Sequence, residues 1–241
     1  MNNRIGYTRF LGILAILLLF SLYGCWDTGE LIEEMPVIHL GEANKVHSTI
    51  VLYKGDLQIS GGSQSALLVS DLSYNLTKWA PKITYTEENS EGFLKIIQKE
   101  NEKEKGLFDP IVNKWSLVFN KTIPLDMEII MGSGENKLDL SNIRLTNLKA
   151  AIGTGDTILD LTGNYQENIS VYLAGGVGHT TILFPKDIGI RLLIKGVLNR
   201  INCHDFSQIG NFYYNSAFDF SENKIYVTIL SGLGMIDINL I

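Results

Sequence analysis

Apolar and polar residues alternate with a period of two through most of this chain. Such alternation, with many β-branched residues, is typical of β-strands that bury one face. An apolar period of 3.6 residues is not sustained over three turns anywhere. Residues 93–105 come closest, but their charged end favours a solvated loop or frayed helix. The pattern therefore predicts an all-β fold. The alternating sets are Ile50/Leu52, Leu57/Ile59, Leu125/Met127/Ile129/Met131, Ile169/Val171/Leu173, Ile190/Leu192/Ile194 and Ile225/Val227/Ile229.

A glycine-punctuated segment recurs about every twenty residues in the second half of the chain. Copies begin at Gly132, Gly153 and Gly176, and weaker copies begin at Gly196 and Gly232. A fixed period of this size indicates one structural unit stacked on copies of itself. Glycine permits the tight bends because it adopts positive φ without steric cost. The repeat predicts a parallel β-solenoid of about 20-residue coils, with paired strands about 4.8 Å apart.

Two positions in each copy, six and eight residues after its first glycine, are predicted to point into the core. The residue between them points outward and is free to be polar, as at Asp139 and Asp160. The fourth copy, which begins at Gly196, lacks one residue, so its inward pair is Ile201 and Cys203, and Cys203 is interpreted as a small core residue. The inward pairs of the first three copies are Leu138/Leu140, Leu159/Leu161 and Ile182/Phe184.

Residues 1–24 have the features of an export signal. Arg4 and Arg9 precede an apolar core at Phe10–Leu22, within the roughly 7–15 residues of a secretory signal. The run Leu22-Tyr-Gly-Cys25 follows. It resembles the lipobox of bacterial lipoproteins, and the resemblance implies that Cys25 is lipidated and becomes the mature N-terminus. An uncleaved signal anchor is the alternative.

The predicted mature chain is acidic. The whole sequence has a net charge of −6, and removal of residues 1–24 takes away two arginines and no acidic residue, which leaves −8. An acidic surface argues against binding to nucleic acid and against electrostatic binding to anionic lipid through a basic segment. Lipidation of Cys25 would leave Cys203 as the single thiol, so no intramolecular disulfide is expected.

The N-terminal half follows the pattern of strand, glycine bend and strand less closely. Strands are predicted at residues 66–74, 82–86 and 92–98, and a boundary is predicted near Asp109-Pro110. The expected organisation is a lipoprotein signal peptide at 1–24, a tether at 25–36, an N-terminal β segment at 37–109 and the C-terminal repeats at 110–241.

Several runs of residues resemble a known family. The N-terminal runs are Ile59-Ser-Gly-Gly62, Asp71-Leu-Ser-Tyr-Asn75, Pro81-Lys-Ile-Thr-Tyr85, and Trp115 with Leu125–Gly132. The later runs are Leu159–Tyr165, Gly175–Thr181 and Phe184–Ile190. Together they resemble the toast-rack family across about residues 37–241. The resemblance implies a bacterial protein, often lipid-anchored, with a parallel β-solenoid body. The repeats are also similar to domains of cell-wall-active-antibiotic response proteins and to domains provisionally assigned as adhesins. The family has no established catalytic residues, so none is carried over.

Two sets of polar residues lie at equivalent positions of the repeats. Glu135, Asp156 and His179 each follow the second glycine, and in register they could bind a divalent metal. Ordinary polar turn residues are the simpler interpretation, so no metal or cofactor is predicted. Asp139 and Asp160 could form the carboxylate pair of a retaining glycosidase, about 5–5.5 Å apart. An outward surface pair is again the simpler interpretation.

A long insertion separates Gly196 from Gly232 and is rich in aromatic residues. Phe212, Tyr213 and Tyr214 are its centre. Exposed aromatics favour a binding patch, whereas a hydrophobic lid over an open strand edge would also need them. Both interpretations stay open. The full set is Phe206, Phe212, Tyr213, Tyr214, Phe218 and Phe220.

These observations predict a non-enzymatic, lipid-anchored β-solenoid on the extracytoplasmic face of the bacterial cell membrane. It would act as a binding or scaffold module in envelope-stress signalling or adhesion, with envelope proteins or cell-wall glycan as partners. A polysaccharide-acting enzyme is the alternative. The sequence leaves open whether the chain caps itself or oligomerises through Met235–Ile241.

Overall fold

The computed structural model describes residues 30–99, 112–196 and 199–241. Within them the chain forms 18 strands and a short 3₁₀ turn, η1 (Thr77–Trp79), so the predicted all-β class is confirmed. None of the described residues belongs to a helix long and apolar enough to cross a membrane. The strands are β1 (Ile32–Glu34), β2 (Val37–His39), β3 (Lys45–Lys54), β4 (Asp56–Ser63), β5 (Ala66–Tyr74), β6 (Pro81–Glu88), β7 (Glu91–Gln98), β8 (Asn113–Asn120), β9 (Leu125–Ser133), β10 (Asn136–Asp139), β11 (Leu145–Thr154), β12 (Thr157–Asp160), β13 (Ile169–Phe184), β14 (Gly189–Lys195), β15 (Asn199–Cys203), β16 (Phe206–Ile209), β17 (Phe212–Asn215) and β18 (Lys224–Leu240).

Four of the sequence-based expectations fall wholly or partly outside the described residues. The predicted signal peptide and the lipidation site at Cys25 lie before residue 30. The predicted boundary near Asp109-Pro110 lies in the undescribed segment 100–111. Residues 32–34 of the predicted tether form β1, which pairs antiparallel with β5.

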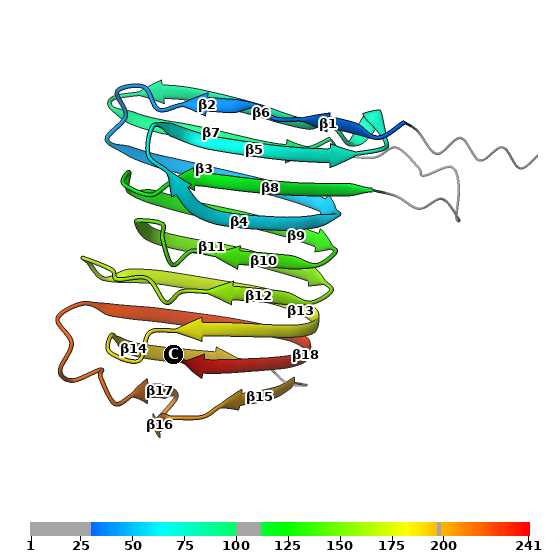
Figure 1. Cartoon of the computed structure of the whole chain (residues 1–241). Coiled ribbons are helices and arrows are strands. Elements are labelled where there is room, and N and C mark those ends of the chain that lie inside the picture. The colour runs from blue at the N-terminus through cyan, green and yellow to red at the C-terminus, as the bar shows by residue number, and fades with distance from the viewer. Residues whose placement is uncertain (1–29, 100–111, 197–198) are drawn as a thin grey trace, which may run out of the picture.

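The strands form one curled sheet that bends into two walls (Figure 1). The first wall consists, in order, of β6, β7, β3, β9, β11, the first half of β13, the first half of β18, β14, β17 and β16. The second wall consists of β1 and β2, β5, β8, β4, β10, β12, the second halves of β13 and β18, and β15.

The sheet is mixed, whereas the sequence predicted parallel pairing. Parallel pairs fill the middle of both walls, and antiparallel strands lie at the ends. At the N-terminal end β6 pairs along the outer edge of β7, and β5 pairs along the outer edge of β8. At the C-terminal end β17 covers β14, and β16 covers β17. Such strands occupy edges that would otherwise be open to pairing with another chain.

The order of the strands in the sheet departs from their order in the chain at both ends. β3 lies between β7 and β9, and β4 lies between β8 and β10. At the other end, β18 lies between β13 on one side and β14 and β15 on the other. The copy that begins at Gly232 is therefore inserted ahead of the copy that begins at Gly196. Met235 pairs with both His179 and Arg200, so the C-terminal strand is not a free edge there.

Glycines form the bend between the two walls. Gly134, Gly155, Gly178 and Gly234 follow one another on neighbouring strands, with φ between 127° and 151°. A Cβ at Gly155 would lie 2.1 Å from the carbonyl oxygen of Gly134, and one at Gly178 would lie 2.4 Å from that of Gly155. Each bend passes so close to its neighbour that no side chain fits. This contact explains the glycine repeat of the sequence.

The core lies between the walls and is built from the inward residues of both. The three predicted inward pairs, from Leu138 to Phe184, are all at most 1% exposed. Full burial of one such side chain contributes roughly 1.5–3 kcal/mol. Cys203 packs against the same core, as predicted, but is half-buried because β15 is the last strand of its wall. Burial raises the pKa of its thiol.

Candidate functional site

A row of polar residues crosses the second wall beside the glycine bend. It contains the predicted Glu135, Asp156 and His179, together with Asp56. Asp56 Oδ1 accepts a hydrogen bond of 3.1 Å from the backbone nitrogen of Glu135. Asp156 Oδ1 accepts one of the same length from the backbone nitrogen of His179. These aspartates therefore join the turns of neighbouring strands.

The His179 ring pairs with Asp237. Its Nε2 lies 2.6 Å from Asp237 Oδ2, while Asn202 Nδ2 donates to Asp237 Oδ1 at 2.5 Å. The hydrogen bond from Asn202, and then that from His179, lowers the pKa of the Asp237 carboxyl. In the described ranges, no three His, Cys, Asp or Glu side chains are grouped as metal ligands would be.

A groove of about 600 Å³ lies on the outer surface of the second wall next to this row. Glu135 and Asp156 line it, with Ile158 44% exposed among the polar residues. Its other lining residues are Asp56, Gln58, Asp71, Ser73, Lys114, Trp115, Ser116, Asn136 and Lys137.

Asp139 and Asp160 lie opposite each other on the paired strands β10 and β12. Asp139 Oδ1 accepts hydrogen bonds from the backbone nitrogen and the hydroxyl of Ser141, at 3.1 and 2.6 Å. Asp160 Oδ1 accepts the equivalent bonds from Thr162, at 2.9 and 2.6 Å. Each carboxylate thus holds the turn that follows its own strand, a common role of aspartate in turns.

The turns after these strands enclose a second cleft, of about 520 Å³. Hydroxyl, amide and charged side chains line much of it, including Thr122, Asn142, Arg144, Asn164 and Gln166. These are groups that donate and accept hydrogen bonds, so the cleft suits a polar ligand.

The aromatic insertion contributes to both the core and the outer surface. Tyr213 pairs in register with the buried Leu192 and packs against the core, as does Phe206. Phe212 and Tyr214, on either side of Tyr213, point outward because side chains alternate along a strand. Asn215 ends the strand, where it accepts from the backbone nitrogen of Ile190 at 2.8 Å. The core-facing ring of Tyr213 and the half-buried outward rings of Phe212 and Tyr214 therefore lie on the two faces of one strand.

Arg191 lies at the centre of the outward rings. Its guanidinium carbon is 4.6 Å from the ring centroid of Tyr226 on β18 and 5.0 Å from that of Phe212 on β17. Tyr214 contacts Phe218 edge-on, with centroids 4.8 Å apart. We name these five residues, Arg191, Phe212, Tyr214, Phe218 and Tyr226, the aromatic surface. Phe212, Tyr214 and Phe218 belong to the predicted aromatic set, whereas Arg191 and Tyr226 were not predicted and are brought together by the pairing of β14 with β18.

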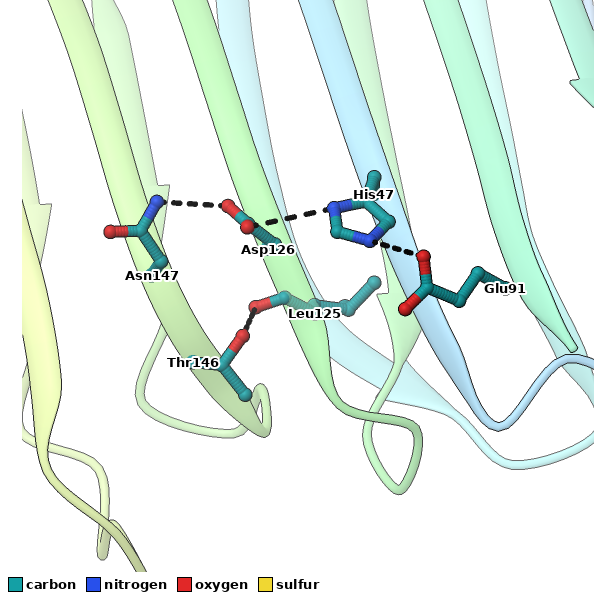
Figure 2. Close-up of polar contacts among 6 residues, drawn as sticks. All are labelled: His47, Glu91, Leu125, Asp126, Thr146 and Asn147. Carbon is teal, nitrogen blue, oxygen red and sulfur yellow. Dashed lines mark hydrogen bonds and ion pairs between the residues drawn. The ribbon is translucent and has the colours of Figure 1, made fainter. Parts of the chain in front are cut away.

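A polar cluster on the first wall was also not predicted. Figure 2 shows His47 between Glu91 and Asp126, with Nε2 3.3 Å from one carboxylate and Nδ1 3.5 Å from the other. Asn147 Nδ2 donates to Asp126 Oδ1 at 2.9 Å, and Phe93 stacks on the His47 ring. These polar side chains come from the neighbouring strands β7, β3, β9 and β11. The 21-residue spacing of Asp126 and Asn147 was the one available signal.

Comparison with known proteins identifies the family to which this chain belongs. The family profile described as the N-terminal domain of toast_rack, DUF2154, matches residues 27–183. A structure from Clostridium sporogenes, provisionally named as a cell adhesion protein, is 32% identical, with a TM-score of 0.83 over 87% of this chain and 99% of that one. This chain therefore belongs to the toast-rack family, as the sequence predicted. No curated protein matches it.

Two more distant structures cover similar shares of the chain. One, from Bacteroides fragilis, is provisionally named as an adhesin and is 13% identical, covering 87% of this chain and 97% of that one with a TM-score of 0.21. The other, from Parabacteroides distasonis, is provisionally named as a lipid-binding protein and is 13% identical, covering 88% and 98% with a TM-score of 0.26. Their low scores carry no argument about this chain.

Proposed function

We propose that this chain is a non-enzymatic, lipid-anchored binding module of the bacterial cell envelope. Its parallel strands would form a β-solenoid body on the extracytoplasmic face of the cell membrane, where it serves adhesion or an envelope-stress scaffold. The toast-rack family and the provisional naming of the Clostridium sporogenes protein support a role in binding.

The outward half of the insertion carries this proposal. Phe212, Tyr214 and Arg191 are held on strands whose opposite faces pack against the core, so the aromatic surface is a rigid platform. Aromatic residues and arginine are enriched among the residues that dominate binding energy at protein interfaces. If the aromatic rings served merely as a lid over the core, all of them would point inward, whereas Phe212 and Tyr214 point outward.

The position of the aromatic surface fits an anchored protein. β1 begins at Ile32, soon after the predicted lipidation site at Cys25, and the insertion lies at the other end of the sheet (Figure 1). Six strand spacings separate β7 from β14 in the first wall, which is roughly 29 Å at about 4.8 Å each. Anchoring through Cys25 would hold the N-terminal end near the membrane and present the aromatic surface away from it.

The cleft lined by Asn142, Asn164 and Gln166 supports cell-wall glycan as a second class of ligand. Its amide and hydroxyl groups match the hydrogen-bonding groups of a sugar. Glycan binding there would be independent of the aromatic surface, so substitution of Phe212 and Tyr214 should leave it intact.

Crosslinking in living cells tests the main proposal. We expect the native protein to capture one specific envelope partner, identified by mass spectrometry, and the Phe212→Ser/Tyr214→Ser variant to lose it. Tyr172→Ser is the matched control, because Tyr172 is an exposed tyrosine on the same wall outside the aromatic surface. Cys25→Ala tests the anchor by release of the protein from the membrane fraction. Equal capture by all variants would contradict a role for the aromatic surface.

A further inference from the structure

We infer that Arg191 is the receptor for carboxylate groups of an acidic, partly apolar segment of a partner protein. This inference rests on the proposed binding function and names the chemistry that the aromatic surface recognises. It assigns the central role to a residue that is not itself part of the insertion.

The position of Arg191 leaves its hydrogen-bond donors for a ligand. β14 lies between β18 and β17, so the Tyr226 and Phe212 rings flank the guanidinium from neighbouring strands on the two sides. Among the described residues, Arg191 has no ion pair or hydrogen bond from its side chain. Rings beside a guanidinium satisfy its flat faces but not its N–H groups. A carboxylate can accept two parallel N–H bonds from that fork.

A second positive charge contacts the aromatic surface at the Phe218 ring, which itself meets Tyr226 edge-on. Lys224 Nζ is 5.5 Å from the Phe218 ring centroid and donates to the backbone oxygen of Ser221 at 2.8 Å. Lys224 thus joins the aromatic surface at the edge formed by Phe218. Two cations held on one ring cluster favour an acidic partner at this surface, and this local charge opposes the net charge of −6 of the whole sequence.

The rim of the aromatic surface favours a protein over a charged polymer. Ile209, the register partner of Phe212, is 68% exposed, and Phe220, two residues after Phe218, is 90% exposed. A polyphosphate or a uronic-acid glycan has no aliphatic side chains to bury against these residues. A peptide that combines carboxylates with apolar side chains can use both the rim and Arg191.

Direct binding to the full-length chain in detergent micelles provides the test. The probe is a synthetic peptide of alternating glutamate and leucine, with a glutamine–leucine peptide, polygalacturonate and inorganic polyphosphate as comparisons. We expect the glutamate peptide to bind, and Arg191→Gln to weaken its binding about tenfold or more, because a neutral amide cannot form the paired, charge-assisted bonds of the guanidinium. Arg200→Gln is the matched control, because Arg200 is an exposed arginine at the same end of the sheet but on the second wall.

Arg191→Lys is a second variant that keeps the charge and the apolar stem, so it keeps the fold if Arg191→Gln does not. An ammonium lacks the guanidinium fork, and we expect intermediate affinity for the glutamate peptide. The inference is overturned if the glutamate peptide does not bind, if it binds native protein and both Arg191 variants equally, or if polygalacturonate or polyphosphate binds more tightly through Arg191.

The same variants separate this inference from the proposed function. If crosslinking to an envelope partner depends on Phe212 and Tyr214 but not on Arg191, the binding module stands and the carboxylate receptor fails. If no variant changes the captured proteins although the peptide binds through Arg191, the proposed function fails at this surface.

Discussion

Tyr213 and Tyr214 are neighbours in the chain but contribute to opposite sides of the sheet. Tyr213 packs against the core opposite Leu192, whereas Tyr214 meets the Phe218 ring edge-on outside it, with centroids 4.8 Å apart. The strand alternation of β17 thus assigns one tyrosine to stability and the other to the surface.

Substitution of these two tyrosines should separate stability from binding. We expect Tyr213→Ser to lower the free energy of unfolding by about 2 kcal/mol, because it leaves a cavity at the edge of the core. Tyr214→Ser should lower it by less than about 1 kcal/mol. Denaturant titration followed by circular dichroism measures both. Equal losses would contradict the assignment of the two faces.

The glycine bend should tolerate no side chain. We expect Gly155→Ala to lower the free energy of unfolding by roughly 3 kcal/mol or more, because positive φ and the 2.1 Å approach to Gly134 both oppose a Cβ. Gly210 has a φ of 60°, and a Cβ there would meet no heavy atom within 4 Å. Gly210→Ala should therefore cost only about 1–2 kcal/mol. Thermal unfolding of the two variants measures the difference in stability. Similar losses of stability would mean that positive φ, and not close contact with the neighbouring bend, requires glycine in the repeat.

Asp156 should stabilise the junction between neighbouring strands. Asp156→Ala removes the acceptor for the backbone nitrogen of His179, and we expect a loss of about 1 kcal/mol. Asp156→Asn keeps a side-chain oxygen in place and should recover most of that loss. Urea titration gives both values. An Asn variant as unstable as the Ala variant would point to charge instead of the hydrogen bond.

The Asp237 carboxyl should titrate below the ordinary aspartate pKa of about 3.9. Since its folded-state pKa is depressed, its contribution to stability is present above the unfolded value and is lost as the pH falls through the folded value. We expect Asn202→Ala to bring the pKa back toward 3.9 and His179→Ala to shift it less. Carbon-detected NMR of the carboxyl measures each pKa. A larger shift in the His179 variant would reverse the order of the two causes.

The Cys203 thiol should react slowly with thiol reagents. Burial raises its pKa, so at pH 8 a smaller fraction is thiolate than in an unfolded chain, and thiolate is the reactive form. We expect one slow thiol in membrane-derived protein if Cys25 is lipidated, and rapid reaction after denaturation. Two reactive thiols in the folded protein would contradict lipidation of Cys25.

The strands and their inward faces could be predicted from local patterns. Period-two alternation predicted that Leu125, Ile169 and Ile225 each begin a set of alternate residues that point into the core. This pattern is local, because every second side chain of a strand lies on the same face. The glycine period likewise predicted the bends, since at a bend with positive φ a Cβ would overlap the carbonyl oxygen of the neighbouring bend.

The order of strands and the composition of the surface clusters were decided only by the tertiary structure. Nothing local says that β18 pairs between β13 and β14, because parallel pairing of similar apolar strands has nearly the same energy in several orders. That insertion brings Tyr226 beside Arg191, and the insertion of β3 places His47 against Asp126. The alternation of residues therefore determined the walls of this protein, and long-range pairing determined which side chains meet on them.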